Sequence, residues 1–338
     1  MRLIRVESAG ALPSLPAGAL LCHDVRDRAQ PRAVVFRKGH RLEQDDIERL
    51  AGVKFGEIHA AVPDPGDLTE NEAAARIAAA VAGDGVLLGQ PRFGQVNLSA
   101  ARRGWLRVNP PVVERVNLVE GALLFTSIGQ RAADHEDVVG GVKCAPLLLS
   151  SASVEAVEKL RSAHGPAVEV AEIPSRSIAL VALDRLGETT LDRARAALSA
   201  SVGWFGSRLE PTFVVSAHGD EPAGAYRKAV ESGAFAVLVA GASATDPLDA
   251  AFEGLRQAGG SVDQIGVPLE PGTACWTGRI AGRQVLGLAS CELFGRPGAV
   301  DLLLPRLLLG ESLDRSLLAR LGSEGLVASL PVHRPAGD

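Results

Sequence analysis

Three strand–loop–helix units follow one another in the second half of the chain, and this alternation constrains the fold more than any other feature. The strands are nearly continuous apolar runs at 177–183, 212–217 and 235–240. Such runs are typical of strands that helices cover on both faces. Helical patterns follow them at about 191–202, from Pro222 to Gly233, and up to Ala258. The alternation predicts an α/β fold with a doubly wound, mostly parallel sheet.

The third helix of this series has the clearest predicted ends. We expect Asp246 as its N-cap, Pro247 as its first residue and Gly259-Gly260 as its stop. Strand-like segments follow it at 264–270, 274–280 and 283–289. The last two are expected to form a hairpin around Ala281-Gly282.

The first half of the chain is less regular, and the composition shifts near residue 174. A chain of 338 residues suggests about two domains. We therefore predict a mixed α+β N-terminal region over 1–150 and an α/β domain over 174–310. Thr69 and Glu72 form a capping-box pattern ahead of an Ala-rich helix at about 70–82. Further helices are predicted at about 110–120 and 153–163, and strands at 122–128 and 141–149.

Composition excludes several classes of protein. The formal net charge is −5 and aromatic residues make up 4%, which argues against a nucleic-acid-binding protein. No apolar run reaches the roughly 18 residues that a membrane span needs. The cysteines lack the spacing of a zinc site or a disulfide framework, at Cys22, Cys144, Cys275 and Cys291. We expect a cytoplasmic protein with reduced thiols, and a frayed Pro- and Gly-rich tail from residue 331.

Ligands of an open parallel sheet bind beyond the carboxyl ends of its strands. The loops predicted at that edge are 184–190, 216–221 and 241–249. In the third loop, Gly241 lets the backbone approach a ligand, and Ser243 and Thr245 supply hydroxyls. A helix start at Asp246 would attract a phosphate, since its first N–H groups have no partner. The competing interpretation is that Asp246 only caps a helix and Gly241 only makes a turn.

Two further groups in these loops add to the candidate site. Thr189 and Thr190 precede the first helix and offer a second anion position. Asp220 and Asp249 are carboxylates that could hold Mg²⁺ or hydrogen-bond a heterocycle.

Read together, the third loop and the hairpin resemble a known family. GASATDPLD (241–249) resembles the pattern G-G-x-S-x-G-x-x-D, and it is followed by a segment with Pro271-Gly272 and by Leu288-Ala289-Ser290 over 266–291. This order is similar to the molybdopterin-binding domain of molybdenum-cofactor biosynthesis proteins. The resemblance covers about 175–310. The chain departs from the family at Ala242 and Asp246, where glycines are usual, and at Leu-Ala-Ser, where Leu-Pro-Gly is usual.

Segments of the first half point to the same family. They resemble molybdopterin molybdotransferase-like proteins at 18–26 and 38–62, and a bacterial molybdopterin-binding branch at 94–100, 114–120 and 140–149.

The resemblance implies a protein that binds molybdopterin, or its nucleotide-linked form, in molybdenum-cofactor biosynthesis or insertion. It implies catalytic roles for Asp220 and Asp249, with Asp249 also a metal ligand. The implied ligand-binding residues are Glu188, Thr189, Ser216, Gly241, Ala242, Ser243, Asp246, Pro271, Gly272 and Ser290. An active enzyme would be a molybdotransferase-like transferase that uses Mg²⁺ and molybdate. A homodimer is expected from the same resemblance.

Two other functions stay open. The altered glycines favour a non-catalytic carrier or chaperone that delivers the cofactor to a molybdoenzyme. A nucleotide pyrophosphatase-like relative is the third possibility.

Three more candidates each have a plainer interpretation. The cluster at 133–137 (ADHED) combines a histidine with three carboxylates, although a solvated charged loop fits equally. His218 could act as a general base or only hydrogen-bond its loop. Cys291 could be a nucleophile if its pKa were lowered, or a structural thiol.

The last candidates lie in the first half. Lys143 interrupts an apolar run, which suggests that it reaches into the cleft between the two domains to meet a phosphate. Asn97 and Asn117 are weaker candidates of the same kind.

Overall fold

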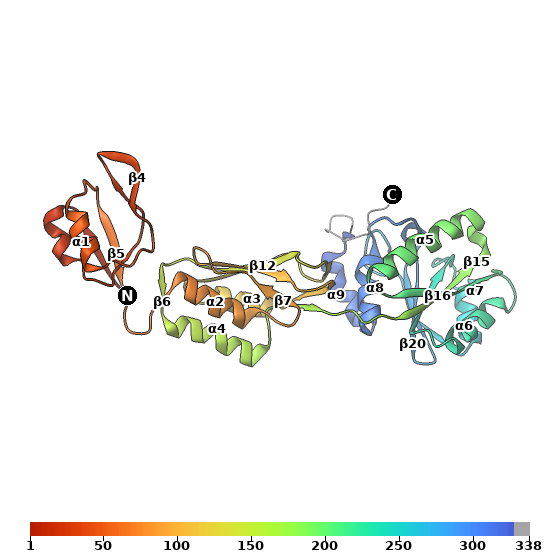
Figure 1. Ribbon diagram of the computed structural model, residues 1–338. Coiled ribbons are helices and arrows are strands. Elements are labelled where there is room, and N and C mark those ends of the chain that lie inside the picture. The colour runs from red at the N-terminus through yellow and green to blue at the C-terminus, as the bar shows by residue number, and fades with distance from the viewer. Residues whose placement is uncertain (328–338) are drawn as a thin grey trace. The chain divides into compact units, whose positions relative to one another are not determined.

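A computed structural model of the chain describes residues 1–327 (Figure 1). The predicted fraying from residue 331 lies outside the described residues. No helix within 1–327 is both long and apolar enough to cross a membrane. The chain divides into two compact units. Unit 1 comprises 1–101, 107–129 and 135–170, and unit 2 comprises 102–106, 130–134 and the chain from Ala171 onward.

Unit 2 is built on a six-stranded sheet of order β16-β15-β17-β20-β19-β18. Its strands are β15 (Ser177–Leu183), β16 (Arg208–Val215), β17 (Ala236–Ala240), β18 (Ser261–Ile265), β19 (Trp276–Ile280) and β20 (Arg283–Gly287). The first four in this order pair parallel, and β19 and β18 join antiparallel. The predicted α/β class is confirmed, and the sheet is mixed.

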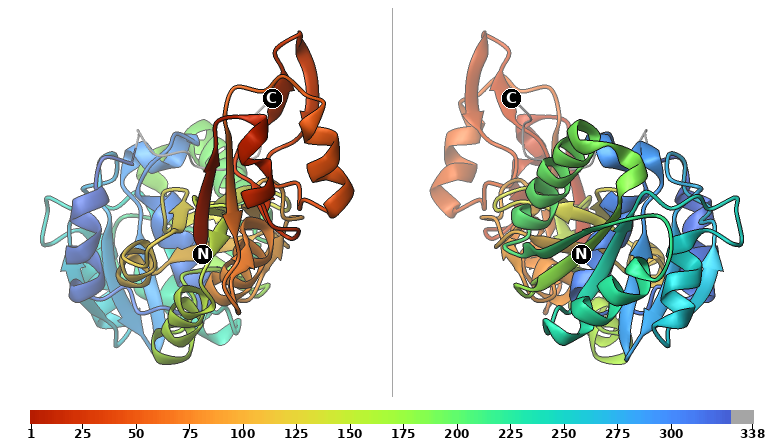
Figure 2. Two further views of the ribbon diagram at one scale, coloured as in Figure 1. Left: turned by 90° about the vertical axis from the view of Figure 1, so that its left-hand side faces the viewer. Right: turned by 90° about the vertical axis from the view of Figure 1, so that its right-hand side faces the viewer.

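Helices cover both faces of this sheet (Figures 1 and 2). They are α5 (Glu188–Trp204), α6 (Glu221–Glu231), α7 (Ala250–Gln257), α8 (Ala299–Leu309) and α9 (Arg315–Leu321). Alternate residues of β15 enter different cores. Leu180 packs in the core that contains α5 and α8, whereas Val181 packs in the core that contains α6 and α7. Burial of both faces explains why the strand is apolar throughout.

Several predicted boundaries in unit 2 are wrong. The strand expected at 212–217 is β16, which begins four residues earlier and ends at Val215. The helix expected to start at Asp246 begins instead at Ala250, with Asp249 as N-cap. Asp246 accepts a hydrogen bond from the Leu248 backbone N–H at 3.0 Å and so closes a local turn before the helix. The strand expected at 264–270 lies earlier, at β18, because its register is set by pairing with β19. The hairpin of β19 and β20 is confirmed.

Short segments of earlier sequence are packed into unit 2. The strands β9 (Gly104–Val108), β11 (Arg131–Ala133) and β14 (Val168–Ala171) form a small sheet of order β11-β9-β14. Arg306 of α8 is 2% exposed and its guanidinium lies 4.7 Å from the Trp105 ring centroid. Arg306 also donates to Gln130 Oε1 at 3.3 Å and to the Leu302 carbonyl at 2.7 Å. A buried arginine therefore ties both inserted segments to α8.

The start of unit 1 is a small sheet of order β1-β5-β2 beside a hairpin of β3 and β4. Its elements are β1 (Arg2–Val6), η1 (Ala9–Ser14), β2 (Leu20–Leu21), β3 (Val25–Asp27), β4 (Gln30–Phe36), α1 (Gln44–Ala51) and β5 (Ile58–Val62). Ile47 and Leu50 of α1 enter a core with Val6 and Ile58.

The rest of unit 1 holds an antiparallel sheet of order β10-β12-β8-β7. Its elements are β6 (Leu68–Thr69), α2 (Glu70–Val81), β7 (Val86–Leu88), β8 (Gln95–Ala100), α3 (Pro110–Asn117), β10 (Ala122–Thr126), β12 (Val138–Cys144), β13 (Leu148–Leu149) and α4 (Ser151–His164). The predicted capping box of Thr69 and Glu72 is confirmed at the start of α2.

One face of this sheet is buried and the other is open. Val96 and Leu98 of β8 are buried on the side that α2 contacts. Gln95 and Asn97, which alternate with them, are exposed. On the open face the Phe125 ring lies over Gly141, where a Cβ would come within 2.5 Å of the ring. The glycine thus lets the aromatic ring lie across the strand.

Candidate functional site

The loops that follow β15, β16 and β17 are tied together at the carboxyl edge of the unit 2 sheet. Asp184 Oδ1, after β15, accepts the Ala217 backbone N–H at 3.0 Å. Gly241, after β17, has φ +89°, and a Cβ there would lie 3.2 Å from the Leu183 carbonyl oxygen. The glycine is therefore needed for both its backbone conformation and its close approach.

Asp249 is the centre of the third loop. It is 2% exposed, and its Oδ1 accepts the Ala251 N–H at 2.9 Å as the N-cap of α7. Its Oδ2 accepts the Ser243 N–H at 2.9 Å and Arg185 Nη1 at 2.8 Å. This carboxylate therefore joins the loop, the helix and an arginine from the first loop.

These contacts decide whether the predicted metal site fits. Both Asp249 oxygens are already hydrogen-bonded, so a metal could reach them only by displacing those donors. Within residues 1–327 no three His, Cys, Asp or Glu side chains are grouped as metal ligands, and this includes the cluster at 133–137. The donor set does not fit Mg²⁺.

The other candidates of these loops lie near the surface. Ser243 Oγ and Thr245 Oγ1 are 3.2 Å apart. Asp220 is exposed at the N-cap position of α6 and makes no side-chain capping bond. Glu188 and Thr189 are exposed in the first turn of α5, whose N-cap is Gly187.

Ser216 and His218 serve their own loop. The Ser216 N–H donates to Glu221 Oε2 at 2.8 Å, and the His218 N–H donates to Ser216 Oγ at 3.3 Å. No hydrogen bond of the His218 ring links it to another candidate residue among those described.

The three loops are acidic. Arg185 is their one arginine, against six carboxylates at Asp184, Glu188, Asp220, Glu221, Asp246 and Asp249. An edge of this kind accepts hydrogen bonds from a donor-rich heterocycle more readily than it attracts an anion.

The remaining candidates surround the start of α8, where the structure reveals a residue that sequence reasoning missed. Glu292 is 4% exposed and its carboxylate accepts the Ala299 N–H at 3.2 Å and the Val300 N–H at 3.0 Å. Gly272 has no room for a side chain, since a Cβ would lie 2.8 Å from Glu292 Oε1. Pro271 precedes this glycine, and Ser290 is exposed two residues before Glu292. The protein's own carboxylate therefore fills the anion position at this helix start. No pattern in the sequence marks Glu292.

The thiols are poor nucleophiles. Burial and the neighbouring Glu292 carboxylate raise the pKa of Cys291. Burial raises the pKa of Cys144 to about 11 and also raises the pKa of Cys275. The nucleophile hypothesis for Cys291 required a lowered pKa, and the shift has the opposite sign.

The candidates of the first half separate into two groups. Asn117 Nδ2 donates to the Leu124 carbonyl at 2.9 Å and Asn117 Oδ1 accepts the Leu124 N–H at 2.7 Å, which is a structural role. Asn97 and Lys143, in contrast, line one pocket of unit 1.

Comparisons with known proteins give limited matches. A family described as a domain of unknown function (DUF8806) matches residues 16–56. No curated protein matches the chain significantly.

Three solved structures are similar to parts of the chain. One is the protein CinA of Thermoplasma acidophilum, described as of unknown function, at 16% identity over 45% of this chain and 99% of that chain, with a TM-score of 0.29. The molybdopterin biosynthesis moea protein of Pyrococcus horikosii has 14% identity over 77% of this chain and 76% of that chain, with a TM-score of 0.29. A molybdenum cofactor biosynthesis protein of Pyrococcus furiosus has 14% identity over 71% of each chain, with a TM-score of 0.27. These TM-scores are too low to carry an inference.

Proposed function

We propose that the chain binds molybdopterin, or a nucleotide-linked form of it, in the biosynthesis or insertion of the molybdenum cofactor. One observation supports this most strongly. The two segments that resemble the molybdopterin-binding domain, 241–249 and 266–291, include the loops that follow β17 and β20. These strands are parallel neighbours in the sheet, and open parallel sheets bind ligands at this edge.

The chemistry of the edge suggests how such a ligand would bind. The N–H and amino groups of a pterin ring are donors, and Asp220 is an exposed carboxylate that can accept them. The terminal phosphate would be held by Arg185, whose side chain is 38% exposed, and by the first turn of α5 near Thr189. The start of α7 is no longer a candidate for the phosphate, because Asp249 caps it.

The test begins with the purified full chain. Mass spectrometry of small molecules released from it should detect a pterin, and isothermal titration calorimetry should show binding at micromolar concentration. Arg185→Gln should weaken binding roughly tenfold, since it removes a charge-assisted hydrogen bond. Arg195→Gln, which changes an exposed arginine paired with Asp192 in α5, is the matched control. The proposal is wrong if neither molybdopterin nor its nucleotide-linked form binds at micromolar concentration.

The carrier function is the second candidate, and the engagement of Asp249 favours it over a metal-assisted transferase. A carrier binds the adenylated pterin but does not convert it. Incubation of the chain with adenylated pterin, Mg²⁺ and molybdate should therefore leave the adenylate intact, as measured by chromatography. Release of AMP at a rate proportional to the protein concentration would contradict the carrier function.

A further inference from the structure

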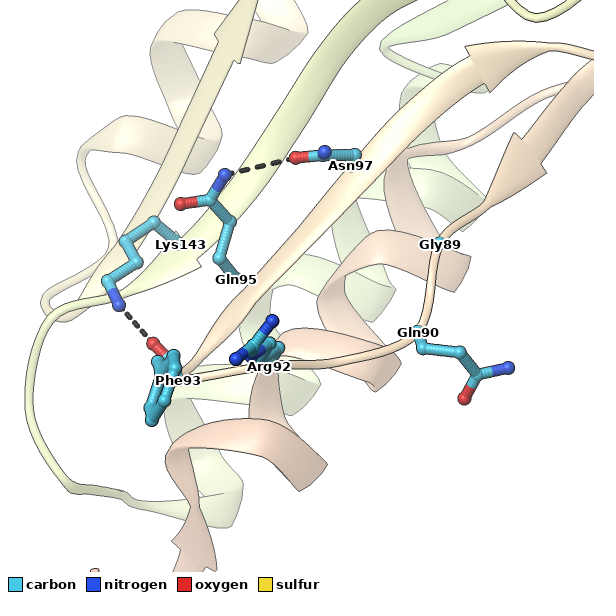
Figure 3. Close-up of a pocket in the computed structure, with 7 residues that line it drawn as sticks. All are labelled: Gly89, Gln90, Arg92, Phe93, Gln95, Asn97 and Lys143. Carbon is cyan, nitrogen blue, oxygen red and sulfur yellow. Dashed lines mark hydrogen bonds between the residues drawn. The ribbon is translucent and has the colours of Figure 1, made fainter. Parts of the chain in front are cut away.

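A pocket of about 460 Å³ lies on unit 1, at the end of the sheet where β8 and β12 pair (Figure 3). Its walls come from the chain between β7 and β8, from the start of β8 and from Lys143 of β12. All of these residues belong to one unit. The pocket is therefore complete within unit 1.

The polar groups of this pocket are cations and carboxamides. Arg92 and Lys143 supply the positive charges, and no carboxylate is among the lining residues. In the described part of the chain, neither cation has an Asp or Glu partner. Lys143 Nζ donates to the Phe93 carbonyl, and the Arg92 guanidinium lies 5.2 Å from the Phe93 ring centroid. Two cations without carboxylate partners favour an anionic ligand.

Three carboxamides are among the residues that line the pocket. Gln95 Nε2 donates to Asn97 Oδ1 at 3.0 Å, as Figure 3 shows. This bond leaves the Gln95 Oε1 acceptor and the Asn97 amino donors open to a ligand. Gln90 adds a third carboxamide to the lining. Carboxamides can hydrogen-bond both the donors and the acceptors at the edge of a heterocycle.

Phe93 is the most unusual residue of the pocket. It stands at φ +52° beside Gly94 at φ +70°, in a two-residue turn closed by hydrogen bonds between Arg92 and Gln95. Turns with two positive φ values favour Asn-Gly, and a bulky residue at the first position is strained. Phe93 is nevertheless 61% exposed. Burial of this side chain therefore stabilises the fold little, and other contacts must offset the strain of its positive φ.

The surrounding structure holds the turn in place. The Gly94 N–H donates to Asn71 Oδ1 at 2.8 Å, and the Gly94 carbonyl accepts the Cys144 N–H at 2.8 Å. With the Lys143 contact, three bonds from other segments fix the turn and present the Phe93 ring at the pocket. Strained residues held in this way cluster at ligand-binding sites.

We propose that this pocket binds a heteroaromatic phosphate, with the planar ring stacked on Phe93. Gln95 and Asn97 hydrogen-bond the edge of the ring, and Arg92 and Lys143 bind the phosphate. The ligand chemistry fits a nucleoside monophosphate or a pterin monophosphate. The site goes beyond the proposed function, because it lies in unit 1 and uses none of the residues at the carboxyl edge of unit 2.

Isothermal titration calorimetry of the full chain tests the site. AMP, GMP and a pterin monophosphate are the probes, with adenosine and inorganic phosphate as fragments. At least one intact probe should bind with a Kd below about 1 mM, and each fragment should bind at least roughly tenfold more weakly. Among the probes whose binding Phe93→Asn weakens, the tightest identifies the source of the ligand.

Two variants separate stacking of the ring from binding of the phosphate. Phe93→Asn suits the turn and should weaken binding of the intact probe roughly tenfold by loss of stacking. Arg92→Gln should weaken the intact probe to a similar extent but leave adenosine binding unchanged. Leu118→Asn removes an exposed apolar side chain elsewhere in unit 1 and is the matched control. The proposal is overturned if all three probes fail to bind below about 1 mM, or if Phe93→Asn binds as tightly as the unchanged chain.

Discussion

The carboxyl edge of the unit 2 sheet and the pocket of unit 1 treat their charged groups in opposite ways. At the edge, Asp249 and Glu292 are buried and accept backbone N–H groups from the starts of α7 and α8. In the pocket, Arg92 and Lys143 have no carboxylate partner among residues 1–327. Asp249 belongs to the segment that resembles a known family, and the difference teaches that such a resemblance can mark a residue that holds loops together. Groups open to a ligand lie where the fold leaves charges and hydrogen-bonding atoms without a protein partner.

The largest effect is expected at Asp249. Asp249→Ala removes the acceptor of two backbone N–H groups and of Arg185, and should lower the free energy of unfolding of unit 2 by about 3 kcal/mol. All three tryptophans belong to unit 2, so their fluorescence during urea denaturation reports its unfolding.

Asp246→Ala is the control, since exposed Asp246 accepts one bond from Leu248. It should cost less than about 1 kcal/mol. Equal effects of the two variants would break the comparison, because Asp249 would then not be the structural centre of its loop.

The next effect is expected at Glu292. Glu292→Gln keeps the shape of the side chain, but its amino group opposes one of the two N–H donors of α8. The free energy of unfolding should fall by about 2 kcal/mol, measured in the same assay. Glu253→Gln, at an exposed position of α7, should change it little. An unchanged stability for Glu292→Gln would mean that the start of α8 is open to another anion.

The sequence predicts β15 and β17 well, because burial on both faces leaves a nearly continuous apolar run in each of them. It misplaces the start of α7, since Asp246 and Asp249 are both good capping residues. Asp249 caps α7 because its carboxylate also accepts hydrogen bonds from Arg185 and from the Ser243 N–H. Arg185 belongs to a different loop, so the sequence around α7 does not reveal this contact. Glu292 could not be found, because its burial depends on the tertiary position of α8.

The sequence singles out two residues of the unit 1 pocket, but it assigns them to a cleft between the domains and not to a pocket within one unit. Lys143 stood out in an apolar run and Asn97 was a weak candidate, and both line the pocket. Arg92 and Phe93 were missed because the dipeptide Phe-Gly is not a recognised turn signal. The alternation of Gln95 and Asn97 with Val96 and Leu98 is the signal that would have identified an open strand face.

A smaller effect is expected on the reactivity of the thiols. The raised pKa of Cys291 keeps it protonated at pH 7.5, so iodoacetamide should alkylate it more slowly than a free cysteine, although the residue is exposed. The rate should rise as the pH is raised towards the pKa, because the thiolate fraction grows. Mass spectrometry of the labelled peptides measures both rates.

Glu292→Gln should speed the alkylation of Cys291, since it removes a negative charge that raises this pKa. Cys144, whose pKa is about 11, should stay unlabelled in the folded chain. Alkylation of Cys291 faster than that of a free cysteine would show that the edge stabilises a thiolate. In that case the contrast between an acidic edge and a basic pocket would fail.

The smallest effect on stability is expected at Phe93, and the direction of the change shows whether the ring stabilises the fold. Phe93→Asn places a residue that tolerates positive φ at +52°, so the free energy of unfolding of unit 1 should rise by about 0.5–1 kcal/mol, measured by circular dichroism. Ala281→Asn, in the corresponding turn of β19 and β20 at φ +46°, should give a similar gain in unit 2 without any change in ligand binding. A loss of stability in Phe93→Asn would mean that the ring serves the fold. A gain in stability together with weaker ligand binding would mean that the chain keeps the strained Phe93 ring for its ligand. At the carboxyl edge, in contrast, Asp249→Ala removes a side chain that stabilises the fold itself.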